Sequence, residues 1–211
     1  MTTILNFIKW LESTGSRLEN MLYQLKWPPP GHLSAALLDQ ISLGYEKGQL
    51  TAQDVDEIFV HFYNKDKLEK LVETWSERDF IQHRMKILKA SVVAHKEGYF
   101  ELSIPTLLPQ IEGIIGDISE HTGRMNFKDI KDYAESIFAR NSRFDRISKG
   151  FLISILLEQF EWRDPMPFFS RNAILHGADT NYASAPNSLR LILIFDLLQN
   201  SMHVPLKAKT S

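Results

Sequence analysis

The chain has 211 residues, 44% of them hydrophobic and 24% charged, with a formal net charge of −2 and no cysteine. Such a composition is typical of a globular protein and excludes general disorder, collagen-like repeats, disulfide frameworks, zinc ribbons and thiol nucleophiles. The near balance of charges also excludes a protein that coats nucleic acid through bulk charge, so any nucleic-acid chemistry must rest on a local patch.

The first half of the chain has the spacing and punctuation of helices. The pattern predicts an N-terminal helix over about Thr3–Leu25, which must end before Pro28–Gly31 because three consecutive prolines cannot continue a helix. Thr51 followed by Asp54 predicts the start of another helix, since a hydroxyl and an acid suit the exposed amides of a first turn. The regular spacing of apolar residues over Asp79–His95 predicts one long helix, closed by Gly98 in a left-handed conformation.

The second half continues the same pattern. Pro105 and Pro109 are expected to bracket the start of a helix, where a missing amide donor costs little. An apolar stripe follows at positions 107, 108, 111, 114, 115 and 118. Further helices are predicted over about 127–139, 145–159 and 189–199, and no alternating pattern bounded by hairpin turns is present.

These patterns predict an all-α helical bundle with an additional helical region at the N-terminus. We expect an N-terminal helical region of unknown role over residues 1–75, a helical bundle over 76–205 and a flexible tail over 206–211. The longest apolar runs, 151–157 and 191–195, are far shorter than the roughly 20 residues of a membrane-spanning helix. No secretory signal pattern is present, so the expected location is the cytoplasm without membrane association.

Most catalytic and cofactor motifs are absent from the chain. The histidines are too far apart in sequence to form a paired metal motif, and no phosphate-binding loop, dinucleotide fingerprint or serine elbow occurs. We therefore expect no cofactor and no metal.

The segment Phe168–Gly177 predicts a short helix that carries Arg171, Asn172 and His176 and closes at its glycine. Asn172 and His176 are four residues apart and share one helix face, and the long Arg171 side chain can swing round to the same end. The three groups can converge on one anion, where an imidazole that exchanges protons beside a fixed cation suits phosphodiester chemistry. The alternative is structural: such side chains also cap carbonyls, pair with an acid or pack as part of the core.

The segment Arg171–Gly177 resembles the Arg-polar-x3-His signature of HEPN domains, an all-helical family that includes prokaryotic toxins and defence ribonucleases. The resemblance spans about residues 80–200 and extends to uncharacterised bacterial HEPN-like proteins. The supporting stretches are 84–88, 94–95, 98–99, 103–105 and 110–113.

This resemblance implies a metal-independent endoribonuclease that cleaves single-stranded RNA and acts in antiviral defence or as a toxin. His176 would help the ribose 2′-hydroxyl to attack the adjacent phosphate, and Arg171 would hold that phosphate. Asn172 would orient either the imidazole or the phosphate. It also implies a homodimer with two motifs facing one cleft, and it leaves room for an antitoxin partner. Ala178 stands where some members carry a tyrosine that a partner enzyme modifies, which argues against that form of control.

Two further observations bear on the candidate site. Glu112 borders the apolar stripe of its predicted helix, so it could reach Arg171 and fix its direction, or it could be a solvated surface residue. The segment 121–150 carries an excess of basic residues that could flank an RNA cleft, although such segments are often only solvated helix faces. The alternative function is a non-catalytic helical module that binds RNA or a protein partner.

Overall fold

The computed structural model describes residues 15–140, 142–162 and 165–201, and all regular structure in these ranges is helical. The predicted all-α class is confirmed. After a helical segment over residues 15–24, the elements are α2 (Ala35–Glu46), α3 (Ala52–Phe62), α4 (Lys65–Ser76), the 3₁₀ helix η1 (Asp79–Arg84), α5 (Met85–Lys96), α6 (Phe100–Ile118), α7 (Phe127–Ile137), α8 (Arg143–Leu156), α9 (Arg171–Leu175) and α10 (Ala185–Ser201). The first part of the predicted N-terminal helix and the predicted 206–211 tail lie outside the described residues.

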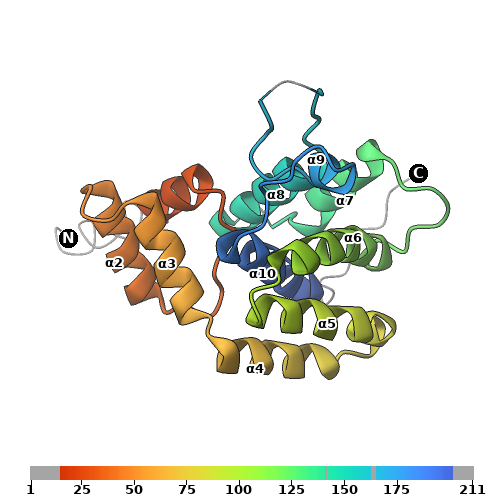
Figure 1. Cartoon of the computed structure of the whole chain (residues 1–211), viewed down its shortest axis with the longest axis horizontal. Coiled ribbons are helices and arrows are strands. Elements are labelled where there is room, and N and C mark those ends of the chain that lie inside the picture. Colours follow the sequence, from red (N-terminus) through yellow and green to blue (C-terminus); the bar gives the residue numbers. More distant parts are fainter. Residues whose placement is uncertain (1–14, 141, 163–164, 202–211) are drawn as a thin grey trace, which may run out of the picture.

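The last described helix, α10, forms the centre of the bundle. It packs against α3, α4, α5, α6 and α8, and Figure 1 shows it in blue with helices on both sides and below. Every residue from Ser188 to Asp196 is buried. A helix that is apolar and buried all round belongs in a core, which explains why this segment shows little amphipathic pattern.

A single hydrophobic core continues through both regions of the predicted division. Its members run from Met21 to Leu198 and come from either side of residue 75. Trp75 itself is fully buried and donates its indole N–H to the Asp196 carboxylate on α10, with a separation of 2.8 Å. The division into residues 1–75 and 76–205 stays a prediction, but the two regions share one core.

The predicted helix starts and stops are mostly confirmed. Thr51 and Asp54 form a reciprocal capping box at the start of α3, and Gly98 has φ of 80° after α5. The apolar stripe of α6 is buried at all six predicted positions. The helices predicted in the second half appear as α7, α8 and α10, with ends that differ by a few residues.

The segment predicted as one helix over Asp79–His95 begins instead with the 3₁₀ helix η1. The burial pattern is as expected, because the predicted apolar face, formed by Ile81, Met85, Leu88 and Val92, is buried. The side-chain amide of Gln82 donates to the carbonyls of Ser76 and Arg78, which holds η1 close to the end of α4.

The prediction that Pro105 and Pro109 lie at a helix start is wrong. Helix α6 begins at Phe100 and contains both prolines. Pro105 has no N–H for the carbonyl of Glu101, and that carbonyl instead accepts a hydrogen bond from the Tyr182 hydroxyl at 3.3 Å. A side chain from a distant loop thus compensates for a bond that the helix cannot make, and the helix continues.

Candidate functional site

The short helix α9 forms as predicted between a serine cap and a glycine. The Ser170 hydroxyl accepts from the backbone N–H of Ala173 at the start, and Gly177 has φ of 75° just beyond the end. The same hydroxyl donates to the carbonyl of Glu158 at 2.9 Å, which fixes the helix to the segment after α8. Arg171 is therefore the first residue of α9, and His176 is the residue that follows its last turn.

Arg171 lies between two partners that set the direction of its guanidinium. Its Nη2 lies 2.6 Å from Oε2 of Glu112 on α6, and its Nη1 donates to Oδ1 of Asn172 at 3.0 Å. The predicted contact between Glu112 and Arg171 is confirmed. The Nε atom of Arg171 is buried without a hydrogen-bond partner in the described chain, so one donor of this side chain is unused.

Asn172 is buried, with 6% of its surface exposed. Its amide nitrogen donates to the carbonyl of Glu158 at 3.2 Å, while its amide oxygen accepts from Arg171. The two groups of the amide thus connect the Arg171 side chain to the backbone that follows α8. In this position Asn172 orients the guanidinium and does not itself face solvent.

His176 is exposed and lies apart from this cluster. The centroid of its imidazole is 6.1 Å from that of the Phe160 ring, and the side chain makes no hydrogen bond or ion pair with a described residue. Within one chain the structure brings Arg171, Asn172 and Glu112 together, and it leaves His176 at the other end of α9. Asn172 and His176 were predicted to share one helix face, but their surroundings differ. Asn172 is buried, whereas His176 is exposed to solvent.

An open pocket of ≈ 480 Å³ adjoins the guanidinium of Arg171. Its lining also includes Glu112, Arg124 and residues at the start of α7. Arg124 belongs to the basic segment 121–150 and is exposed. Elsewhere in that segment, Lys149 and Arg146 are already engaged with Glu135 and Glu19 at 2.7 and 2.9 Å, so their charge is largely compensated. Because Arg171 is paired with Glu112, the net positive charge of the pocket lining comes from Arg124.

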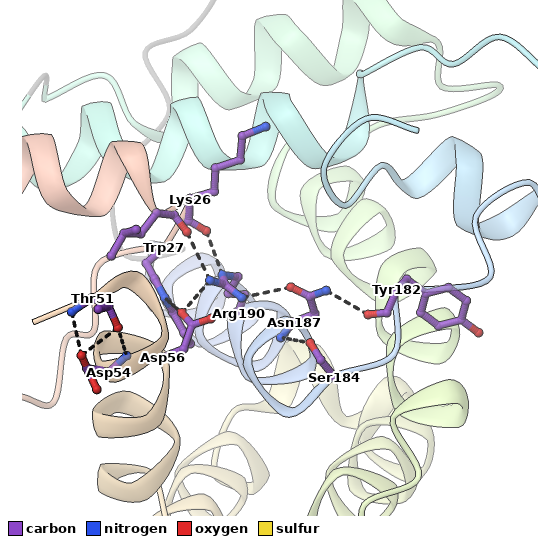
Figure 2. A network of polar contacts seen from close by, with 10 residues as sticks. Lys26, Trp27, Thr51, Asp54, Asp56, Tyr182, Ser184, Asn187 and Arg190 are labelled. Atoms are coloured by element: carbon purple, nitrogen blue, oxygen red, sulfur yellow. Dashed lines mark hydrogen bonds and ion pairs between the residues drawn. The ribbon is translucent and has the colours of Figure 1, made fainter. Parts of the chain in front are cut away.

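Sequence reasoning missed a buried polar network on α10. The guanidinium of Arg190 donates to the carbonyls of Leu25 and Lys26 and to the carboxylate of Asp56, and lies 4.1 Å over the Trp27 ring (Figure 2). Burial lowers the pKa of Arg190 to about 10, which still leaves the side chain charged at neutral pH. The sequence held one signal of this network: Arg190 is a charged residue within a mostly apolar helical segment.

The pKa values of His32 and His95 are shifted in opposite directions by their surroundings. The hydrogen bond to Asp196 raises the pKa of His32, whereas burial lowers the pKa of His95 to about 4. His95 lies in the core, where its Nδ1 is 2.8 Å from the Ser188 hydroxyl. Its burial indicates a structural role for this histidine.

Within the described ranges, no group of three or more histidine, aspartate or glutamate side chains is arranged to hold a metal ion. None of the helices described is long and apolar enough to cross a membrane. Comparison of the chain with protein-family models, with curated proteins and with solved structures finds no match.

Proposed function

We propose that this protein is a metal-independent endoribonuclease of the HEPN class that cleaves single-stranded RNA in the cytoplasm, in defence or as a toxin. The observation that carries the proposal is the arrangement on α9: Arg171 is held by Glu112 and Asn172 at one end, and an exposed His176 stands at the other. A rise of about 1.5 Å and a rotation of about 100° per residue separate the two positions by about 7.5 Å along the helix axis and about 140° around it. The two side chains meet at one phosphodiester when the long Arg171 side chain turns towards the end of α9.

In this mechanism the imidazole of His176 takes the proton of a ribose 2′-hydroxyl, and the resulting oxygen attacks the adjacent phosphorus. The bond from phosphorus to the 5′-oxygen breaks, which leaves a cyclic phosphate on one product and a 5′-hydroxyl on the other. Arg171 offsets the negative charge that grows on the phosphate oxygens. The leaving oxygen needs a proton, which the His176 imidazole of a second copy supplies in a homodimer with facing motifs.

The decisive experiment incubates purified protein with single-stranded RNA in EDTA. Wild type should cleave RNA and leave the matching DNA intact, because DNA lacks the 2′-hydroxyl. His176→Ala and Arg171→Ala should lose most activity, while the control His61→Ala, at an exposed histidine on α3, should retain it. RNA that stays equally intact with wild type and variants would refute the catalytic role.

A second candidate function is a non-catalytic module that binds RNA or a protein partner through the same surface. It is favoured by the burial of Asn172 and by the short ion pair that already neutralises Arg171, since both are typical of a structural motif. This function predicts that Arg171→Ala lowers the melting temperature, and that wild type binds RNA without cutting it. A gel-shift assay and a thermal melt on the same variants separate the two functions.

A further inference from the structure

A second pocket, of ≈ 250 Å³, lies on a part of the molecule away from α9. Its lining comes from the segment before α2, from the end of α3 and from α4. The residues are His32, Tyr63, Lys67, Lys70, Leu71 and Thr74. Three of these six side chains are basic and none is acidic. Figure 1 shows α4 and α9 on opposite sides of the bundle, so this pocket is separate from the site around Arg171.

His32 is held at the pocket by a buried carboxylate. Its Nε2 lies 3.0 Å from Oδ2 of Asp196, whose side chain is 7% exposed, whereas the imidazole is 48% exposed. The hydrogen bond to Asp196 raises the pKa of His32, which favours the protonated ring. Because Nε2 is committed to Asp196, the Nδ1–H of the protonated ring is the donor that remains for a ligand.

Tyr63 contributes a buried hydroxyl whose hydrogen is unused. The residue is 2% exposed, and its oxygen accepts the backbone N–H of His32 at 3.4 Å. No described residue accepts its hydrogen, so the hydroxyl can donate into the pocket that it lines. Burial raises the pKa of Tyr63, which keeps the phenol protonated and able to donate.

Lys67 and Lys70 are three residues apart on α4 and therefore share one face of that helix. The ammonium of Lys67 lies 3.9 Å from the centroid of the Phe62 ring, which restrains the position of its charge. Neither lysine forms an ion pair with a described residue. Two cations without a carboxylate partner in the described chain, beside an imidazole whose protonated form the Asp196 carboxylate favours, create a site for an anion with several oxygens.

We propose that this pocket binds the phosphate group of a small phosphorylated molecule. Lys67, Lys70 and His32 face the phosphate oxygens, the Tyr63 hydroxyl donates to one of them, and Leu71 offers an apolar surface to the rest of the ligand. The volume lies just below the roughly 300–1,000 Å³ of pockets for drug-sized ligands, so it suits a small molecule. This proposal does not depend on cleavage of RNA at α9.

The first test measures binding of inorganic pyrophosphate by isothermal titration calorimetry. Wild type should bind in a saturable manner at one site, and Lys67→Gln with Lys70→Gln should weaken binding by about tenfold or more. The matched control is Lys86→Gln with Lys89→Gln, an exposed pair with the same spacing on α5 that removes the same charge. The control should change the affinity for pyrophosphate by no more than about twofold, because it alters only the overall electrostatic potential of the protein and no group that lines the pocket.

Absence of saturable binding by wild type, or an equal loss in both double variants, would overturn the proposal. The second test identifies the site: the ring resonances of His32 should shift in NMR spectra when pyrophosphate is added. A single-stranded RNA without terminal phosphate is the competing ligand. Competition by that RNA as strong as that of pyrophosphate would assign the pocket to a nucleic-acid backbone and overturn the small-molecule assignment.

Discussion

Arg171 on α9 and Glu112 on α6 form an ion pair of 2.6 Å in which both side chains are largely shielded from solvent, with 28% and 22% of their surfaces exposed. The pair joins two segments that are far apart in sequence and fixes the direction of the guanidinium beside the ≈ 480 Å³ pocket. Any substrate phosphate that approaches Arg171 must therefore share it with a carboxylate. This makes Glu112 a positioning residue for the proposed reaction.

Glu112→Gln should lower the free energy of unfolding by about 1–2 kcal/mol, because a half-buried cation loses its charged partner. Urea denaturation measures the change. Glu135→Gln serves as control, since its ion pair with Lys149 is more exposed and should contribute less than about 0.5 kcal/mol. Equal effects of the two substitutions would show that the Arg171 pair is no stronger than a surface pair.

Arg190→Lys should lower the free energy of unfolding by about 3 kcal/mol or more. A lysine ammonium cannot reproduce the planar fork that reaches Asp56 and two backbone carbonyls while lying over Trp27. The same substitution at the exposed Arg140 should be nearly neutral. The comparison in urea isolates the buried network, and a loss below about 1 kcal/mol at Arg190 would contradict it.

His95 should destabilise the protein in acid. Burial lowers its pKa to about 4 in the folded protein, against an ordinary histidine value of 6.5, so the unfolded chain takes up a proton first as the pH falls. Its contribution to stability is complete above pH 6.5 and declines towards pH 4, by about 3 kcal/mol in total. His95→Gln should remove this part of the pH dependence in thermal melts. An unchanged slope between these pH values would show that folding does not lower the pKa of His95.

His32 should have the opposite effect. Because the hydrogen bond to Asp196 raises its folded pKa above 6.5, its contribution is complete below that pH and is lost as the pH rises through the folded pKa. The difference in melting temperature between wild type and His32→Gln should therefore shrink as the pH rises above 6.5. A difference that stays constant over this range would mean that folding does not raise the pKa of His32.

Tyr182→Phe should destabilise wild type by about 0.5–1.5 kcal/mol, because the Glu101 carbonyl left free by Pro105 loses its donor. In a Pro105→Ala background the helix regains the backbone N–H for that carbonyl, so the same tyrosine substitution should cost much less. A double-mutant cycle measured by denaturation gives the coupling between the two positions. Independent, additive effects would contradict the compensation.

Much of the fold could be predicted because its signals are local. The start of α3 is specified by Thr51 and Asp54, which are three residues apart. The end of α9 is likewise specified by the short segment from Leu175 to Gly177. For Glu112, its position beside an apolar stripe left two alternatives, a contact with Arg171 or a solvated surface position, and the structure shows the contact. The prolines of α6 were placed wrongly because their compensation comes from Tyr182, a residue that no local pattern connects to them.

The polar partners in the core could not be predicted either, because no local pattern connects residues that are far apart in sequence. Asp56 and Arg190, or His32 and Asp196, pair across more than half of the chain, and their pairing depends on how whole helices dock. The surroundings of Asn172 and His176 follow similarly from packing against the segment after α8. Helix periodicity gives the angle between two side chains, but the neighbours decide which of them is buried.

The hydrogen bonds of Arg190 have a consequence for folding during synthesis. The carbonyls of Leu25 and Lys26 meet their donor only after about 165 further residues have been made. Until α10 emerges, the first helical segment has no buried cation against which to dock, and the central position of the core is empty. Contacts of such high sequence separation are formed late and slow the search for the native state. The nascent chain must therefore keep its early helices from aggregating without their core until α10 is complete.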